Sequence, residues 1–237
     1  MSAVDRAFHG LRHMIATGRL GPEERIPPEN ELCDELGVSR GPLREAVRML
    51  AALRVVEPRH GSGTYVSQLR PEDIIGSLSL TVDLLPLAGL LEVYEIRRIL
   101  ESHMAAQAAA RVTAESLRTV MEPMEAMEAQ QDPSKTSTLD HRFHSAIARI
   151  GGNPALESLL EVFRARSRAY QLFTLPQSAE IKRASDEEHR AIATAIANRD
   201  PVAAATAAAT HVAHTERWLH TLLPPAAADG GHGSDSS

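Results

Sequence analysis

The stretch from Gly37 to Leu53 constrains the fold of this chain more than any other segment. It reads GVSRGPLREAVRMLAAL, so a glycine suited to a turn and a serine suited to a helix N-cap precede a long helical pattern. Apolar and basic side chains each recur at helical spacing but on different faces: Leu43, Val47 and Leu50 form one set, and Arg40, Arg44 and Arg48 form the other. One face can pack on a core while the other meets a polyanion.

The segments around this helix complete a small domain. Residues 5–18 and 28–36 predict two preceding helices, the second opened by proline. Residues 55–66, VVEPRHGSGTYV, predict two short strands joined by a turn with Arg59 and His60 at its tip. The net charge of the chain is −6, yet residues 40–59 hold five arginines against two glutamates, a local charge of +3. The pattern therefore predicts a winged helix-turn-helix that binds DNA.

The segment from residue 20 to 66 resembles the DNA-binding domain of GntR-type bacterial transcription regulators, through its GVSRxxxREAxxxL run and its GxGTxV wing. The resemblance implies DNA contacts from Ser39, Arg40, Arg44, His60 and Gly61, and the basic face of the helix adds Arg48. An arginine at the start of a recognition helix can read guanine through O6 and N7, whereas Ser39 is better suited to phosphate.

Three positions depart from the family pattern. Asn30 stands where some relatives have an arginine that contacts DNA, so a contact there is weaker or missing. Glu23 and Arg54 stand where the family often has glycine. None of these changes removes the expected fold.

The remainder of the chain predicts helices only. Their expected spans are 72–85, 89–111, 114–130, 135–150, 154–174, 178–198 and 201–222, with no alternating strand pattern among them. The expected fold is mainly α: a winged helix-turn-helix with a small β-wing at 1–69, and an all-α bundle of about seven helices at 70–223. The small, polar and glycine-rich residues 224–237 predict a disordered tail.

The helical part also contains candidate metal ligands. Asp140 and His144 share one helix face, one turn apart, and His189 and His211 lie on the two last expected helices. Three imidazoles and one carboxylate suit a divalent first-row ion. The alternative stays open at this point, because eleven histidines produce such a pair by chance fairly often. His214, one turn from His211, is a rival ligand.

The segment 72–222 resembles the FCD effector domain of the FadR subgroup of these regulators. The matching motifs are ExRxxLE (Glu95, Arg97, Leu100, Glu101), DxxFH (Asp140, Phe143, His144), GNP (Gly152, Asn153, Pro154) and Hx10Dx10H (His189, Asp200, His211). The resemblance implies that Asp140, His144, His189 and His211 bind zinc, with nickel or manganese as alternatives.

The same resemblance implies a small organic acid as effector. Arg97 is the candidate clamp for its carboxylate, because a guanidinium matches carboxylate geometry. The competing interpretation of Arg97 is a structural ion pair with a core carboxylate. Arg164 and Arg168, one turn apart, are weaker candidates for the clamp.

We therefore expect a ligand-responsive transcription regulator, a repressor in the first instance, rather than an enzyme. It should bind operator DNA as a homodimer, because one recognition helix reads only a half-site. A metal sensor and, less well supported, a metal-dependent hydrolase are the alternatives. The single Cys33, the absence of a signal-peptide pattern and the lack of a long apolar run predict a cytoplasmic protein with no membrane span.

Overall fold

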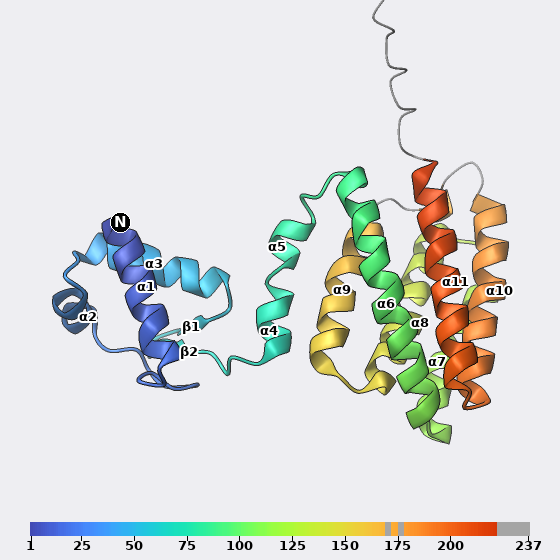
Figure 1. Ribbon diagram of the computed structural model, residues 1–237, viewed down its shortest axis with the longest axis horizontal. Coiled ribbons are helices and arrows are strands. Elements are labelled where there is room, and N and C mark those ends of the chain that lie inside the picture. Colours follow the sequence, from blue (N-terminus) through green and yellow to red (C-terminus); the bar gives the residue numbers. More distant parts are fainter. Residues whose placement is uncertain (169–171, 175–177, 222–237) are drawn as a thin grey trace, which may run out of the picture. The chain divides into compact units, whose positions relative to one another are not determined.

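The computed structural model describes residues 1–168, 172–174 and 178–221 (Figure 1). Its contacts divide the chain into two compact units, Met1–Val82 with Pro154–Val162 and Asp83–Asn153 with Phe163–Ser237. The predicted boundary after residue 69 stays a prediction. The predicted tail at 224–237 lies outside the described residues.

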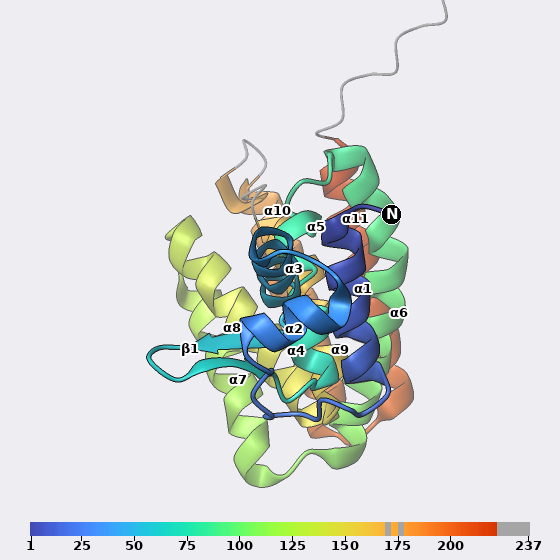
Figure 2. The same ribbon diagram turned by 90° about the vertical axis from the view of Figure 1, so that its left-hand side faces the viewer.

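The first unit contains the winged helix-turn-helix. Its elements are α1 (Ala3–Ala16), α2 (Glu29–Leu36), α3 (Arg40–Ala52), β1 (Val56–Arg59) and β2 (Gly63–Val66). The two strands pair antiparallel, with Val56 opposite Val66, and the hairpin extends beyond the three helices (Figure 2). A core of fully buried side chains joins all five elements, including Leu11, Leu32, Leu43, Leu50 and Val66. The mainly helical fold class with a small β-wing is confirmed.

The turn that joins α2 and α3 has the conformation that its residues favour. Gly37 follows α2 with φ of 61°, a left-handed conformation that glycine adopts without steric cost. Ser39 is the N-cap residue of α3 in extended conformation, as expected, but its side chain makes no capping hydrogen bond. Its hydroxyl is therefore not used by the helix that it precedes.

Glu23 and Arg54, the two positions where the resemblance suggested glycine, both have a backbone conformation that glycine favours. Glu23 has φ of 64° and Arg54 has φ of 59°, so both hold a left-handed conformation despite their side chains. At Arg54 this conformation turns the chain from α3 into the wing, and its carbonyl accepts a hydrogen bond from the Ser67 hydroxyl. The departures from glycine therefore leave the fold intact at a cost in backbone strain.

The single helix expected at 72–85 is wrong. The structure has two short helices there, α4 (Pro71–Gly76) and α5 (Ser79–Val82). The hydroxyls of Ser77 and Ser79 donate to the carbonyls of Ile74 and Gly76 at 2.7 and 2.9 Å, where they compete with the helical backbone pattern. Serine and glycine in succession therefore interrupt a segment whose apolar residues suggested one continuous helix.

The second unit is built from long helices. They are α6 (Leu87–Arg111), α7 (Ala114–Ala129), α8 (Pro133–Gly151), α9 (Pro154–Arg168), the 3-10 turn η1 (Leu172–Thr174), α10 (Ser178–Ala197) and α11 (Pro201–His220). The first half of α9 belongs to the other unit by its contacts. Of the helix expected at 154–174, residues 169–171 lie outside the described residues and 172–174 form the 3-10 turn.

The packing of this unit directs α8, α10 and α11 toward one interior. α11 packs along α6 and α10, while α8 packs on α6 and α7 (Figure 1). Asp132 and Asp200 cap α8 and α11 through their carboxylates, so each helix starts at the proline that follows. Small side chains such as Ala105, Ala108 and Ala204 are buried between the helices and allow close approach. In the part of the chain that the structure describes, no helix is long and apolar enough to cross a membrane.

Candidate metal centre and nucleic-acid interface

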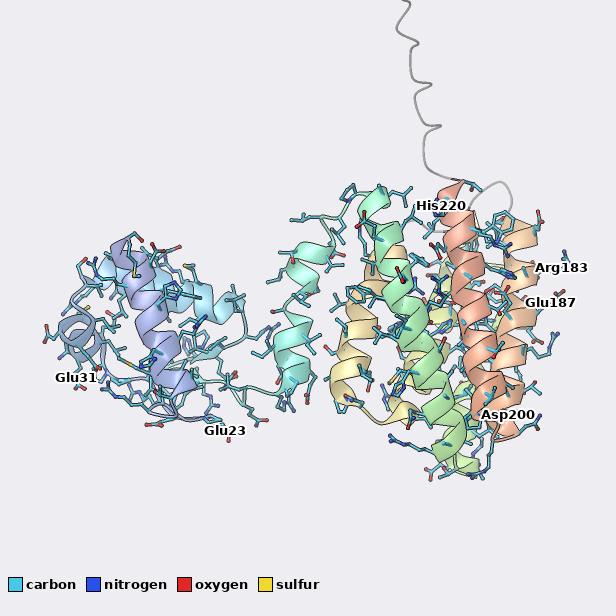
Figure 3. The ribbon with its side chains drawn as sticks, in the orientation of Figure 1. Glu23, Glu31, Arg183, Glu187, Asp200 and His220 are labelled. Carbon is cyan, nitrogen blue, oxygen red and sulfur yellow. The ribbon has the colours of Figure 1, made fainter. Side chains whose placement is uncertain are left out.

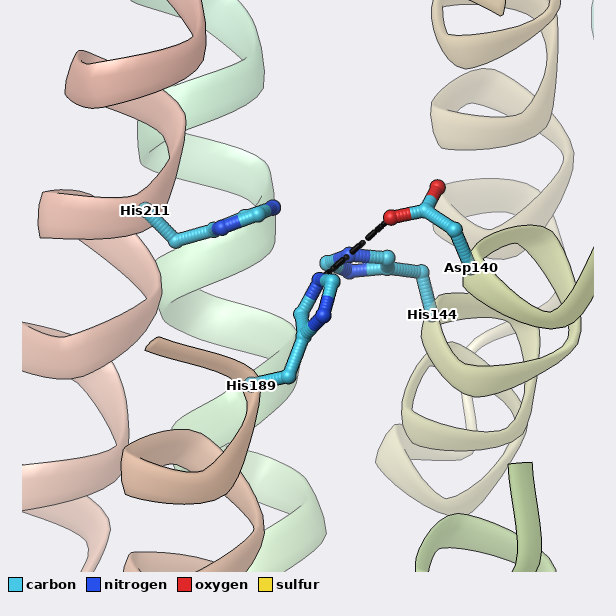
Figure 4. A group of neighbouring side chains, drawn as sticks. All are labelled: Asp140, His144, His189 and His211. Carbon is cyan, nitrogen blue, oxygen red and sulfur yellow. Dashed lines mark hydrogen bonds and ion pairs between the residues drawn. The ribbon is translucent and has the colours of Figure 1, made fainter. Parts of the chain in front are cut away.

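Three helices bring four of the predicted ligands to one point. α8 supplies Asp140 and His144, α10 supplies His189 and α11 supplies His211 (Figure 4). One potential ligand atom from each residue lies within 4.8 Å of the others, and all three histidines are buried. Asp140 and His144 share a face because they are one helical turn apart. Their meeting with His189 and His211 depends on helix packing alone.

The ring nitrogens converge at distances that suit a shared cation. The Nε2 atoms of His144 and His189 are 3.1 Å apart, and a carboxylate oxygen of Asp140 lies 3.3 Å from the Nε2 of His189 and 3.6 Å from that of His144. Ligand atoms about 2.0–2.1 Å from one metal ion are separated by about 3 Å at ordinary coordination angles. The donor set and its spacing therefore fit a divalent first-row metal ion.

Each imidazole also has a polar neighbour at Nδ1, the ring nitrogen that does not face the cluster. The Nδ1 of His211 donates to Glu188 Oε2 at 2.9 Å, and the Nδ1 of His144 lies 3.3 Å from Glu101 Oε2. The Nδ1 of His189 faces the Ser185 hydroxyl at 3.5 Å. An acceptor at Nδ1 places the proton there and leaves Nε2 with a free lone pair. The carboxylates beside Nδ1 of His211 and His144 therefore favour the tautomer that a metal ligand requires.

Burial keeps the His189 and His211 rings neutral. Desolvation, together with the nearby His211 ring, lowers the pKa of His189 to about 3, and desolvation also lowers the pKa of His211. Burial alone would raise the pKa of Asp140, but Arg164 and the adjacent imidazoles outweigh it and hold that pKa well below the usual range. At neutral pH Asp140 is therefore ionised and the His189 and His211 imidazoles are neutral, the protonation state that metal binding needs.

A buried ion-pair network supports this cluster. Arg97 donates from Nε and Nη2 to Glu101 Oε1 at 2.9 and 2.7 Å, and both side chains are at most 4% exposed. Arg164 donates to Glu101 at 3.0 Å and to Asp140 at 2.7 Å. Arg97 therefore takes the ion-pair arrangement that was its alternative interpretation, and its role as an effector clamp stays a prediction. Arg164, one of the weaker candidates, contacts a candidate ligand directly.

A cavity opens beside the candidate ligands. Its volume is ≈440 Å³, within the range of small-molecule sites. The walls include side chains from the metal cluster and from the surrounding helices: Arg97, Asp140, Arg164, Arg168, His211 and Trp218. Ser137, Thr138 and Thr215 also line it. The cavity is therefore lined by polar and ionisable side chains on the side where the cluster lies.

The rival ligand His214 has another partner. Its Nδ1 makes a short hydrogen bond with Glu188, the carboxylate that also holds His211. His214 lines the cavity and lies outside the four-residue cluster. The packing of α10 against α11 therefore separates two histidines that helical spacing alone cannot distinguish.

Sequence reasoning named the four candidate ligands but missed the residues that orient them. Glu101 carried a usable signal, because it lies four residues after Arg97 on one helix face. Glu188 precedes His189 directly, but its bond to His211 joins two helices whose packing no local pattern predicts. Ser185 likewise had no signal beyond its spacing of four from His189.

In the other unit, the six predicted DNA contacts are all exposed: Ser39, Arg40, Arg44, Arg48, His60 and Gly61. Two of the arginines on α3 are paired with carboxylates. Arg44 donates from Nε and Nη2 to Glu29 at 2.8 and 2.9 Å, and Arg48 donates to Glu45 at 3.3 Å. The DNA-contacting roles of the six residues stay predictions.

The wing has its own basic side chain. Arg59 lies over the Tyr65 ring at 4.4 Å and pairs with Glu57. A winged helix-turn-helix with a basic helix face, joined to a helical domain with a buried polar cluster, defines a DNA-binding regulator with a separate sensory domain.

Comparison with known proteins agrees with this class. Residues 3–66 match the family described as bacterial regulatory proteins, gntR family, and residues 92–214 match the FCD domain. The chain belongs to the gntR family of bacterial regulatory proteins, and its FCD domain fits the FadR-like subgroup. Both predicted resemblances are confirmed.

The chain is similar to named transcription regulators over most of their length. The chain is 29% identical to the galactonate operon transcriptional repressor of Escherichia coli, over 94% of this chain and 99% of that one. It is 32% identical to the HTH-type transcriptional regulator Mce2R of Mycobacterium tuberculosis, over 87% of each. The solved structure of a Streptococcus agalactiae GntR has 32% identity and a TM-score of 0.55, covering 90% of this chain and 99% of that one.

The protein is therefore a DNA-binding transcription regulator and not an enzyme, as its family and relatives indicate. Regulators of this family bind operator DNA and are typically dimeric, with effectors bound by the FCD domain. The FCD domain is a metal-binding type of domain, and its candidate ligands come together here.

Proposed function

We propose that this protein is a repressor that binds operator DNA as a homodimer and releases it when a small organic acid binds the FCD domain. In this proposal Asp140, His144, His189 and His211 hold one divalent ion, with zinc favoured by three imidazoles and one carboxylate. The observation that carries the proposal is the convergence of these four side chains at the edge of the ≈440 Å³ cavity.

The charges of the site support an anionic effector. The guanidinium groups of Arg97 and Arg164 are balanced by the carboxylates of Glu101 and Asp140, and the imidazoles of His189 and His211 are neutral at pH 7. When bound, a divalent ion supplies a positive centre to which a carboxylate can coordinate. The network itself does not neutralise that added charge, so an acid is the effector that this environment favours.

Two further observations favour an effector over the ion alone as the signal. The cavity beside the ligands is large enough for a small organic molecule, which a site built only to sense an ion does not need. A similar protein is named for a galactonate operon, and galactonate is a carboxylate. Hydroxyls of Ser137, Thr138 and Thr215 add hydrogen-bonding groups to the same walls.

The first test is the metal content of the full-length protein. Elemental analysis should find one divalent ion per chain in the wild type and a large loss in His189→Ala. His220→Ala is the matched control, because His220 is an exposed histidine near the end of α11 (Figure 3) and should leave the metal content unchanged. Equal metal content in all three proteins would refute the ligand assignment.

The second test separates an acid effector from a metal signal. A panel of small carboxylates is screened by thermal shift on metal-loaded and metal-free protein, since a bound ligand raises apparent stability. DNA affinity is then titrated with metal alone and with metal plus the best acid. Release of DNA only by the acid supports the proposal. Release by metal alone would make the protein a metal sensor instead.

A further inference from the structure

The best-formed contact on the predicted DNA-binding surface is the pair between Glu29 and Arg44. Glu29 lies in the first turn of α2, directly after two prolines, and Arg44 lies one turn into α3. Both Glu29 oxygens accept from Arg44, at 2.8 Å from Nε and 2.9 Å from Nη2. The hydrogen bond with Arg44 lowers the pKa of Glu29, so the carboxylate is ionised at neutral pH. The pair links the two helices of the helix-turn-helix.

This pairing leaves the far end of the Arg44 guanidinium available. An arginine has five N–H donors, and Glu29 uses the edge formed by Nε and Nη2. Both hydrogens on Nη1 and the second hydrogen on Nη2 remain. One hydrogen of Nη1 and the remaining hydrogen of Nη2 form another fork at the tip of the side chain. A fork of this kind can donate to O6 and N7 of one guanine. Glu29 therefore occupies one edge of Arg44 without blocking the edge that reads a base.

We propose that Glu29 is a positioning residue for base recognition, which holds Arg44 in one orientation so that its free fork meets a base edge in the operator. This rests on the prediction that Arg44 enters the DNA interface. A long side chain held at two points loses less conformational freedom on binding than a free one. A carboxylate behind the arginine also disfavours its movement to other acceptors.

The exposure of the pair argues against a role in stability. The side chain of Arg44 is 59% exposed and that of Glu29 is 45% exposed, and exposed ion pairs add little to folding. Approach of DNA would exclude water from the same pair and strengthen it. The alternative is that Glu29 competes with DNA for Arg44. The two models predict opposite effects of removing the carboxylate.

The experiment uses the full-length dimer and two duplexes. One duplex is selected from a random-sequence library by the wild-type protein, and the other is its scrambled version. Glu29→Gln should weaken binding of the selected duplex by about 3- to 10-fold, a part of the discrimination that one bidentate arginine provides. It should leave the scrambled duplex bound equally or more tightly, because a negative charge near the phosphates is gone.

Two variants separate geometry from charge. Glu29→Asp keeps the charge but shortens the side chain, so it should also lose discrimination if orientation is what Glu29 supplies. Glu31→Gln is the matched control, because Glu31 is an exposed carboxylate on the same helix that points outward (Figure 3) and has no ion pair among the described residues. It should change the ratio of the two affinities by less than about twofold.

A double-mutant cycle tests whether Glu29 acts through Arg44. If it does, Glu29→Gln should change the affinity ratio by less than about twofold in the Arg44→Ala background. Tighter binding of the selected duplex by Glu29→Gln, or an equal effect in both backgrounds, overturns the proposal. If Arg44→Ala leaves the selected duplex bound as in the wild type, both this inference and the predicted DNA contact of Arg44 fail. If Arg44→Ala weakens binding of the selected duplex but neither Glu29→Gln nor Glu29→Asp does, the inference about Glu29 fails while the predicted DNA contact of Arg44 is supported.

Discussion

The two units of this protein use the same pair of chemical groups in opposite environments. In the DNA-binding unit, Arg44 and Glu29 form a two-point ion pair with about half of each side chain exposed. In the effector domain, Arg97 and Glu101 form a similar pair with at most 4% exposed. Water can replace either partner of the first pair, whereas burial leaves water little access to the second.

This difference matches what each unit must do. A pair that supports DNA recognition has to leave part of its arginine accessible as phosphates and bases approach, and an exposed pair does so. The residues behind a buried polar cluster have to stay in place, and a buried charge without its partner is costly. Arginine–carboxylate pairs therefore provide accessible contacts on α3 and a buried support between α6, α8 and α9.

Acid should produce the largest difference between the two units, because it acts on several buried groups of the effector domain together. The pKa of His189 is about 3 in the folded chain against 6.5 for an ordinary histidine, so the unfolded chain binds the proton first as pH falls. Stability of the metal-free effector domain should be constant above about pH 6.5 and fall from there toward pH 3. The lowered pKa values of Asp140 and Glu101 extend the loss to lower pH.

The measurement can follow the two units separately. Trp218, the single tryptophan of the chain, lies on the wall of the cavity and reports on the effector domain by fluorescence. Hydrogen exchange followed by mass spectrometry reports peptides from residues 3–66 and 92–214. We expect the second region to lose protection at a higher pH than the first. Simultaneous loss in both regions would contradict the assignment of acid sensitivity to the buried network.

Removal of one buried partner should have the next largest effect. Arg97→Ala leaves Glu101 buried with less compensation, so the effector domain should lose about 3–5 kcal/mol of its free energy of unfolding. Arg98→Ala is the neighbouring control. Arg98 is 42% exposed and forms a long ion pair with Glu216, at 3.8 Å. Its removal should therefore lower the free energy of unfolding by less than about 1 kcal/mol. Chemical denaturation monitored by Trp218 measures both. Equal losses would show that burial does not distinguish the pairs.

Removal of the exposed partner should affect binding rather than folding. Arg44→Ala should weaken operator binding by about 1–3 kcal/mol if Arg44 reads a base, and relax the preference at that base. Its melting temperature should match that of the wild type, because the pair with Glu29 is exposed. Fluorescence anisotropy with a labelled duplex, at one stated salt concentration, gives the affinity. A large drop in the melting temperature of Arg44→Ala with unchanged operator affinity would show that the exposed pair serves folding rather than DNA binding.

The smallest expected effect concerns two arginines with positive φ. Arg54→Gly should stabilise the DNA-binding unit by less than about 1 kcal/mol, because glycine relieves the left-handed strain at φ of 59° but adds freedom to the unfolded chain. Arg199→Gly in the effector domain should not stabilise. Arg199 has φ of 55°, but its guanidinium also donates to the Val112 carbonyl. Thermal unfolding of both variants tests the contrast, and stabilisation by Arg199→Gly would contradict it.

Much of the DNA-binding unit could be predicted from sequence because its signals are local. The helical spacing of Leu43, Val47 and Leu50 and the turn at Gly37 depend on neighbours within a few residues, and the observed helix α3 ends within one residue of the expected position. A clear error, the helix at 72–85, arose where side-chain hydroxyls of Ser77 and Ser79 bind carbonyls that a continuous helix would use.

The candidate metal centre could be predicted only in part. Asp140 and His144 share a face by spacing, but no local pattern places His189 and His211 beside them, and the resemblance to the FCD domain was needed to favour the four as one site. Spacing could not choose between His211 and His214, since one helical turn leaves both on the same side. The contacts of Glu188, which accepts from both rings, depend on how α10 packs against α11.

The sequence by itself determined the family, the two kinds of domain and the side chains available for metal and DNA, because each depends on periodicity or on motifs within short segments. Only the tertiary structure decided what surrounds those side chains. It connected Arg164 to Glu101 and to Asp140 and set Glu29 behind Arg44. These pairings depend on distances between helices, and such distances follow from the packing of whole side-chain surfaces rather than from the order of residues along any one helix.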